Sequence, residues 1–349
     1  MRAARLTDLA AVVDLSRLSH GGDGTGDGRM RTLGLPVASG NISVFSLFRL
    51  PLGALLPNDL LYVYEERGRV IGLARVEHES LRNEWTIVEL DAIDNGAAGD
   101  VRFRLVQQVL RDGSKRGGIR FHVACADMGG NVELLMQAGF ARYGEEYVLY
   151  RSADQGPIPA ISPTQAAEQG IRPAVPLDAL QLDRLYRAST PAPVCLLEDY
   201  RLPDWERQGG HWRVPRSSLT PLLRFADVEA FVQEASGAGQ ELLAFCQVGV
   251  AKEDQPDYLR VIARADHHPS DLIAYGLSFI DEQKRTRRAD RARPSRSDPG
   301  VVSVVRSYEM PLDRRLEEQG FTSVAVVSLL MKEVAERVTQ PALVPVASR

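Results

Sequence analysis

One order of residues occurs twice in the sequence, about 170 positions apart. Arg2-Ala-Ala-Arg-Leu-Thr-Asp8 reappears as Arg172-Pro-Ala-Val-Pro-Leu-Asp178, so an arginine, an alanine and an aspartate recur at the same spacing. Hydrophobic residues at helical spacing follow Asp8, and Thr7 or Asp8 is a typical helix N-cap. Each copy therefore predicts an extended start that leads into a helix.

A predicted β-hairpin recurs in the middle of each half. Residues 60–76 alternate apolar and polar side chains around an Arg67-Gly68 turn, which is typical of two strands joined by a tight turn. Residues 228–235 and 242–248 repeat this pattern around a turn at Ser236–Gly239, about 171 positions later. The two hairpins are a second matched landmark.

Each half closes with a strand, a helix ending in Gly-Phe and a final strand. The segments are 121–125, 133–140 and 147–151 in the first half, and 301–306, 312–321 and 324–332 in the second. Three landmarks in one order indicate a duplication, and 349 residues suit two domains. We expect domains at 1–152 and 170–338, a proline-containing linker at 153–169 and a flexible tail at 339–349.

Composition excludes several classes of protein. A formal net charge of −4 and a pI near 5.9 argue against a dedicated nucleic-acid binder. The three cysteines lie far apart without CxxC spacing, which fits a reducing compartment and predicts no metal site. No secretory signal and no apolar stretch of membrane-spanning length is visible, so a cytoplasmic protein without a membrane partner is expected.

The order of predicted elements resembles the GNAT superfamily of acyl-CoA-dependent N-acetyltransferases. In the first half the resemblance is carried by Arg2–Asp8, the Gly68 hairpin, the strand 85–93 and Asn131–Phe140; in the second, by 172–178, 231–248, 258–264 and 312–321. It implies an α/β (α+β) fold with two tandem GNAT-like domains, each a mixed, mostly antiparallel sheet flanked by helices. Tandem members such as the mycothiol synthase type are known, in which one half can be catalytic and the other degenerate.

The resemblance implies acetyl-CoA as cosubstrate, bound where a helix begins after a splayed strand, because helix N-termini attract anions. It places cofactor contacts on six residues of the first half: Ile93, Gly99, Val101, Arg102, Arg104 and Asn131. Asp100 and Arg102 replace the two glycines that the family uses there. In the second half Ser270 or Asp271 caps the matching helix without a glycine pair, and an ordinary capped helix is the alternative for this segment.

Amine acetylation needs a base, and the resemblance points to the strand before this helix. Glu89 and Asp91 share one face of that strand because alternate residues point the same way. A solvated strand face is the alternative for Glu89. The tyrosine that serves the family as general acid falls on Leu135 and Leu316. Two functions therefore stay open: an N-acetyltransferase acting on an amine of a small molecule or protein, and a non-catalytic binding or assembly protein.

Three further segments carry weaker signals. His20 and the glycine-rich run 21–28 lie where acceptor-side loops are expected, as a substrate lid or as a flexible loop. The run 284–296 has seven basic residues and one acidic residue, and we interpret it as an extended loop that is solvated or binds an acidic partner. His267 and His268 are a candidate base or metal pair, but adjacent side chains point apart, which favours an exposed turn.

Overall fold

The computed structural model describes most of both halves. The described residues are 1–8, 10–12, 15, 59–93, 98–127, 130–156, 161–219, 225–235, 241–251, 256–290, 300–309 and 311–334. His20, the run 21–28, residues 291–296 and the expected tail at 339–349 lie outside this set.

The elements that can be followed in the first half are six strands, with one helix between the fourth and fifth and another between the fifth and sixth. In chain order they are β1 (Arg2–Ala3), a 3-10 turn η1 (Leu6–Asp8), β2 (Asp59–Glu66), β3 (Arg69–Glu79), β4 (Glu84–Ala92), α4 (Ala98–Lys115), β5 (Arg120–Ala126), α5 (Asn131–Gln137) and β6 (Ala141–Arg151). The predicted hairpin is present as β2 and β3. Arg67 and Gly68 both have positive φ, 50° and 79°, as a two-residue turn between twisted strands requires.

The described part of the second half follows a similar order of strands and helices. It contains η2 (Ala153–Gln155), α6 (Pro163–Glu168), β7 (Ile171–Pro173), η3 (Pro176–Asp178), α7 (Ala179–Ser189), α8 (Ala192–Glu198), α9 (Leu202–Gln208), β8 (Phe225–Glu234), β9 (Leu242–Ala251), β10 (Asp257–Ala263), α10 (Ser270–Asp290), β11 (Val301–Arg306), η4 (Ser307–Glu309), α11 (Pro311–Glu318) and β12 (Thr322–Glu333). The basic run was expected to begin as a loop at residue 284. That expectation is wrong for 284–290, which continue α10 as helix.

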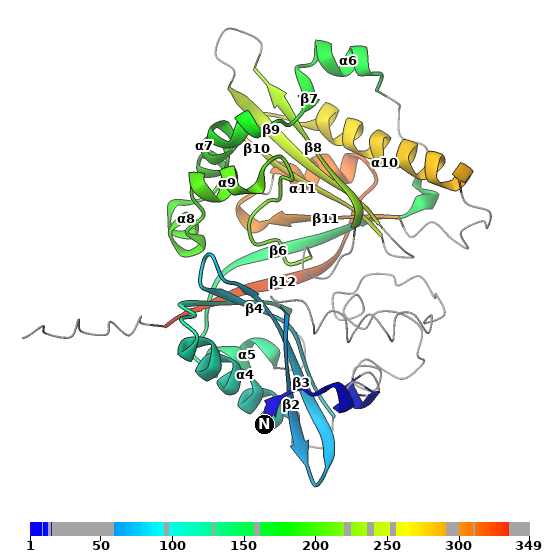
Figure 1. Ribbon diagram of the computed structural model, residues 1–349. Helices are drawn as coiled ribbons and strands as arrows, with labels where there is room; N and C mark the ends of the chain where they lie inside the picture. Colours follow the sequence, from blue (N-terminus) through cyan, green and yellow to red (C-terminus); the bar gives the residue numbers. More distant parts are fainter. Residues whose placement is uncertain are drawn as a thin grey trace, which may run out of the picture.

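The two halves share one continuous sheet. Its strand order is β1-β2-β3-β4-β5-β12-β6-β11-β10-β9-β8-β7. The last strand of the second half, β12, therefore pairs with β5 of the first, and the last strand of the first half, β6, pairs with β11 of the second. Figure 1 shows β6 and β12 crossing the middle of the molecule between the halves. Each half thus completes the sheet of the other.

The repeated arginine and aspartate form the same cluster in each half. Arg2 binds Asp8 at 2.6 Å and Glu65 of the hairpin at 2.7 Å. Arg172 binds Asp178 at 2.7 Å and Glu234 at 2.6 Å. In both copies the aspartate also accepts a backbone N–H three residues before it, which caps the turn that follows the first strand. The repeat in the sequence therefore encodes a repeated joint between the first strand, the turn and the hairpin.

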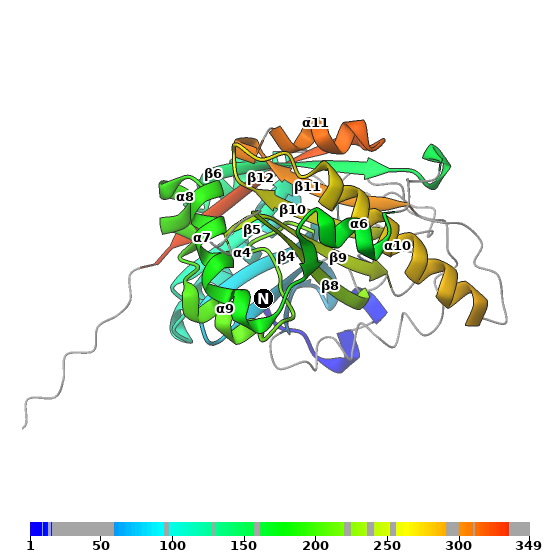
Figure 2. The ribbon, with the colours of Figure 1, turned by 90° about the horizontal axis from the view of Figure 1, so that it is seen from above.

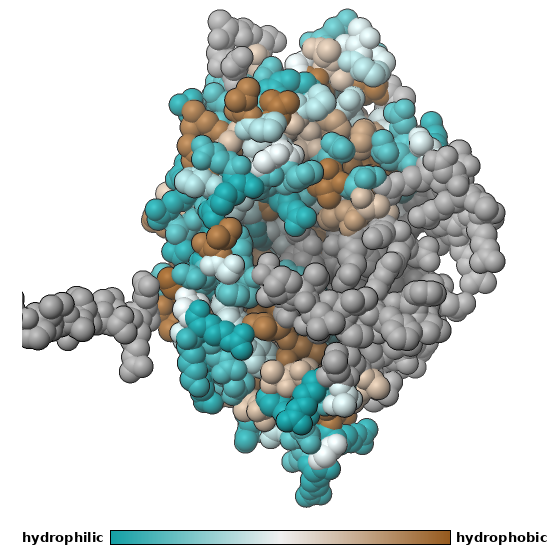
Figure 3. Space-filling view, in the orientation of Figure 1, coloured by the Kyte–Doolittle hydropathy of each residue, from teal (hydrophilic) through white to brown (hydrophobic). Residues whose placement is uncertain are grey.

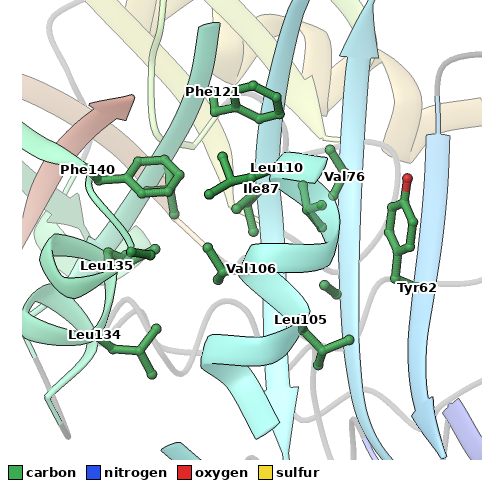
Figure 4. Packing of buried hydrophobic residues seen from close by; sticks show 14 of the residues in the cluster. Tyr62, Val76, Ile87, Leu105, Val106, Leu110, Phe121, Leu134, Leu135 and Phe140 are labelled. Atoms are coloured by element: carbon green, nitrogen blue, oxygen red, sulfur yellow. The ribbon is translucent and has the colours of Figure 1, made fainter. Parts of the chain in front are cut away.

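Helices cover both faces of the sheet. In the first half α4 and α5 bury a core against β3, β4 and β5 that includes Ile87, Leu105 and Phe121 (Figure 4). In the second half α10 and α11 lie side by side in both ribbon views and share a core with β9, β10 and β11 (Figures 1 and 2). The opposite face of that half is covered by α7 and α9, which pack against Val232, Phe245 and Ile262.

The described surface gives no sign of a membrane span. Figure 3 shows hydrophilic residues over most of the described surface on this side, with hydrophobic residues scattered between them. Within the described ranges, no helix is long and apolar enough to cross a bilayer.

Candidate functional site

The strands β4 and β5 form a fork, which we call the first fork. They pair in parallel over four residue pairs, from Glu84–Arg120 to Ile87–Val123. Beyond this point β4 continues in register with β3 only, and β5 with β12 only. The polypeptide then leaves β4 at its open end and re-enters as α4, so the open end of the first fork lies beside the start of a helix.

A β-bulge lies at the point where the first fork opens. Arg75 of β3 faces Glu89 and Val76 faces Ile87, so Val88 has no partner on β3. Before the bulge Trp85 and Ile87 face the core under α4, and after it Leu90 and Ala92 do. An extra residue inverts the alternation of a strand. The bulge therefore turns Glu89 and Asp91 to the face of the sheet away from α4.

Glu89 and Asp91 share that face, as their spacing predicts. Glu89 lies directly opposite Arg75 across the β3–β4 pair, and Asp91 lies opposite Leu73. Asp91 is buried, whereas Glu89 is partly exposed. Arg75 also lies 3.8 Å from the carboxylate of Glu77, two residues along β3.

The start of α4 brings together some of the residues expected to contact acetyl-CoA. Gly99 lies in the first turn, where an added Cβ would meet nothing within 4 Å. Asp100 binds Arg104 at 2.8 Å, and both side chains are about half exposed. The aspartate at the former glycine position is thus paired with a cation one turn later. This pairing reduces the repulsion that Asp100 would otherwise exert on a phosphate.

The four remaining residues of this group have different surroundings. Arg102 turns to α5 and donates to Asn131 Oδ1 at 2.5 Å, so these two expected cofactor contacts touch each other. Val101 is buried in the core under α4. The Ile93 N–H donates to the Ile71 carbonyl at 3.0 Å. The backbone donor of Ile93 is therefore already used within the sheet.

The positions that replace the family's tyrosine are core positions. Leu135 and Leu316 are both buried among the hydrophobic residues of their own halves. Of the tyrosines near them in the sequence, Tyr143 and Tyr308 lie in a buried cluster between the halves. In that cluster Tyr143 donates to Glu198 at 3.3 Å and Arg306 donates to Tyr308 at 2.7 Å. Burial raises the pKa of Tyr308 to about 12, so its phenol keeps its proton.

The second fork, between β10 and β11, is built differently. Parallel pairing covers three residue pairs, from Asp257–Val301 to Leu259–Ser303. The register of β10 with β9 runs unbroken from Tyr258 to Ala263, so this strand carries no bulge. Leu259 and Val261, on either side of Arg260, face α10. Arg260 therefore lies on the face away from α10, at the place that Glu89 occupies in the first fork.

Arg260 is buried and ion-paired, and its Nε has no hydrogen-bond partner in the described structure. Its guanidinium binds Glu309 at 2.8 Å, and only 1% of the Arg260 side chain is exposed. Glu309 also accepts the Arg306 N–H at 3.0 Å. The second fork is therefore occupied by the protein's own Arg260–Glu309 ion pair. The signal for it in the sequence is an arginine within the otherwise apolar run Tyr258–Ala263.

The remaining candidates for chemistry are the three cysteine thiols and two adjacent histidines. Burial raises the pKa of the Cys125 thiol, on β5, to about 12, and the pKa values of Cys195 and Cys246 are also raised. His267 contacts Gln233 at 2.8 Å while His268 is exposed, as expected for adjacent residues in a turn. No group of three or more potential metal ligands occurs among the residues that the structure describes.

Comparison with known proteins identifies the fold. No protein-family model and no curated protein matches the sequence. The chain is similar to a tandem GNAT protein from the clavulanic acid biosynthesis pathway, with 13% identity and a TM-score of 0.54 over 94% of this chain and 95% of that one. It is similar to a GCN5-related N-acetyltransferase from Sphaerobacter thermophilus, with 15% identity and a TM-score of 0.56 over 95% and 94%. A putative acetyltransferase from Pyrococcus horikoshii matches with 11% identity and a TM-score of 0.51 over 96% and 89%.

Proposed function

The chain has the tandem GNAT fold that its element order predicts, and we propose that it is an acyl-CoA-dependent N-acetyltransferase whose first half carries the reaction. One observation supports this assignment above the others. The bulge at Val88 turns Glu89 and Asp91 to the face of β4 away from α4, where the first fork opens. Bulges beside active sites commonly re-aim a side chain in this way.

Glu89 is proposed as the general base. An amine acceptor reaches the protein mainly as an ammonium ion and must lose a proton before it can attack a thioester. The Glu89 carboxylate, directly or through a water molecule, takes this proton, and Arg75 lies opposite it across the β3–β4 pair. Asp91 adds negative charge on the same face, which attracts a cationic acceptor.

The start of α4 is proposed to hold the pyrophosphate of acetyl-CoA. The residues present fit this role in part, because Gly99 leaves space at the first turn and Arg104 neutralises Asp100. The free N–H groups of a helix start bind phosphate oxygens. Arg102, held by Asn131, adds a positive charge one turn into the helix. Acetyl-CoA supplies the acetyl group as an activated thioester, and transfer to the amine is direct, because burial keeps the Cys125 thiol protonated.

The second half supports a second candidate function. Arg260 and Glu309 fill the second fork, and neither half has the family's glycine pair or tyrosine. These features favour a non-catalytic protein in which the GNAT folds bind or assemble with a partner. Fold alone does not determine which of the two functions the chain has.

Calorimetric titration of acetyl-CoA into the full-length chain separates the two candidates. In Gly99→Trp the indole would lie at the first turn of α4, where a Cβ meets no described atom within 4 Å, so binding should weaken at least tenfold. The matched control is Asp271→Trp, at the exposed first turn of α10, which should leave the affinity unchanged. Absence of acetyl-CoA binding by the unaltered chain would refute the acetyltransferase assignment. Loss of affinity in Asp271→Trp alone would move the site to the second half.

A further inference from the structure

A buried network of ion pairs joins the two halves at the closed end of the first fork. It connects the turn before β4 and the starts of β4 and β5 to α8, α9 and the segment that follows α9. We call this network the brace. Its members are Arg82, Glu84 and Arg120 from the first half, and Asp199, Asp204 and Arg216 from the second.

Glu84 is the centre of the brace. Arg82 donates to both of its carboxylate oxygens at 2.9 Å, Arg120 lies 3.6 Å away, and Arg216 of the second half contacts it as well. The Glu84 side chain is fully buried. Three arginines on one buried carboxylate fix its position, because the charge has no route to solvent and is compensated only by these contacts.

Carboxylates of the second half also pair with Arg82 and Arg120. Arg82 binds Asp204 at 2.7 Å and also donates to the Glu198 carbonyl at 2.7 Å. Arg120 binds Asp199 at 2.9 Å. The guanidinium of Arg82 lies 4.8 Å from the centre of the Tyr200 ring. Both arginines at the closed end of the first fork are therefore held by residues of the other half.

Backbone strain is concentrated in the brace. Four non-glycine residues among those described have positive φ, and two of them are the brace residues Asp199 and Arg216, with φ of 45° and 57°. A third, Asn83 with φ of 53°, lies between Arg82 and Glu84. A left-handed conformation at such residues costs about 1–3 kcal/mol and persists only where the surroundings impose it. Strain of this kind gathers at sites where a precise geometry is needed.

We propose that Glu84 is a positioning residue for the first fork and that the second half serves the reaction by holding it. This inference rests on the proposed function. Glu84 and Arg120 are the first pair of a parallel ladder that is only four pairs long, and the bulge follows directly after its last pair. Fixing this pair sets the direction in which β4 and β5 separate, and with it the place of Glu89. In the second half the Arg260–Glu309 ion pair occupies the fork, and we assign a supporting role to α8 and α9, which carry or adjoin the partners of Arg82 and Arg120.

The proposed role of the brace predicts different effects for two asparagine substitutions in the second half. Asp199→Asn removes the ion pair to Arg120 and keeps a residue that tolerates positive φ. Asp183→Asn is the control, because Asp183 pairs with Arg187 within α7 at 2.8 Å and that pair does not contact the first half. Glu84→Gln tests the centre of the brace, and Asp199→Asn keeps the test valid if Glu84→Gln does not fold.

Two measurements on the full-length chain decide the proposal. Amide hydrogen exchange should accelerate at least tenfold in β4 after the bulge for Asp199→Asn and Glu84→Gln, with no such change in β9 or in Asp183→Asn. Turnover is measured as release of CoA thiol from acetyl-CoA with a panel of primary amines. In both variants kcat per folded molecule should fall by about tenfold, while KM for acetyl-CoA changes less than twofold. A purely structural role would lower the folded fraction and leave kcat per folded molecule unchanged.

The outcomes separate the two proposals. Unchanged exchange in β4, or equal changes in Asp183→Asn, would overturn the role of the brace even if the chain is an active acetyltransferase. An unaltered chain without acetyl-CoA binding would overturn the proposed function, and the exchange comparison would still show whether the brace holds the first fork.

Discussion

The first and second forks occupy the same place in the two halves, yet their polar residues have opposite charge and opposite surroundings. At the opening of the first fork a bulge presents Glu89 and Asp91 on the face of β4 away from α4. At the same place in the second, an unbroken strand presents Arg260, which is buried and paired with Glu309. The duplicated parts that build the fold have kept their residues, whereas the parts that would carry chemistry have not.

The residues that the halves share explain this contrast. The Arg2–Asp8–Glu65 and Arg172–Asp178–Glu234 clusters have the same partners and similar distances, because the joint that they form is needed in each copy. No such shared requirement is visible at the two forks, where Glu89 and Arg260 differ. A fork that is no longer used gains stability when its polar backbone is covered and its charges are paired. We therefore interpret the second fork as one that has been filled.

The largest expected effect concerns the filling of the second fork. Glu309→Gln leaves the buried Arg260 without its counter-charge, and the loss of one partner of a buried pair costs about 3–5 kcal/mol of unfolding free energy. Glu89→Gln in the partly exposed first fork should cost less than about 1 kcal/mol. Urea denaturation of the full-length variants measures both. Equal losses at the two positions would remove the contrast between a filled and an open fork.

The next effect is on turnover. Glu89→Gln keeps the size of the side chain and removes the base, so kcat should fall by about 10²-fold or more, while the calorimetric affinity for acetyl-CoA stays within about twofold. In the second fork, Arg260→Lys should leave kcat per folded molecule unchanged. Release of CoA thiol with a primary amine provides the measurement. Unchanged turnover in Glu89→Gln would exclude Glu89 as the base, and a loss confined to Arg260→Lys would place the reaction in the second half.

The sequence allowed most of the fold to be predicted, because its landmarks are local. The Arg67-Gly68 turn and the Gly139-Phe140 and Gly320-Phe321 ends fix where strands and helices stop. The exchange of β6 and β12 was not predictable, since either strand has the alternation needed to pair beside β5 or β11. The helix over 284–290 was missed because the basic run lacks the apolar spacing that marks a packed helix.

The candidate site was predictable only in part. The spacing of Glu89 and Asp91 shows that they share a face, but not which face, because that depends on the bulge at Val88. A bulge leaves no mark in a run such as Trp85–Asp91, where either register buries some apolar residues. The brace was missed for another reason. Glu84 and Arg216 are 132 positions apart (216 minus 84), and nothing local in either segment indicates that they meet.

The smallest expected effect tests a difference between β5 and β11 as a function of pH. His122 of β5 is buried on the face away from α4, where β11 has Val302 and Val304, and neither of its ring nitrogens has a hydrogen-bond partner in the described structure. Burial, with Arg120 and Arg82 nearby, lowers the pKa of His122 to about 3. Between this value and the ordinary pKa of 6.5, the unfolded chain binds a proton that the folded chain does not.

Folding stability should therefore fall as the pH is lowered below 6.5, because protons bind preferentially to the unfolded chain in this range. Between pH 7 and pH 5 the contribution of His122 amounts to about 2 kcal/mol. In His122→Leu this part of the pH dependence should be absent, whereas the exposed His268→Leu in the second half should retain it. Unfolding free energies from urea titrations at pH 7, 6 and 5 measure the slopes. Equal slopes in His122→Leu and the unaltered chain would show that the His122 imidazole is hydrated or hydrogen-bonded in the folded protein. The proposed difference between β5 and β11 would then be removed.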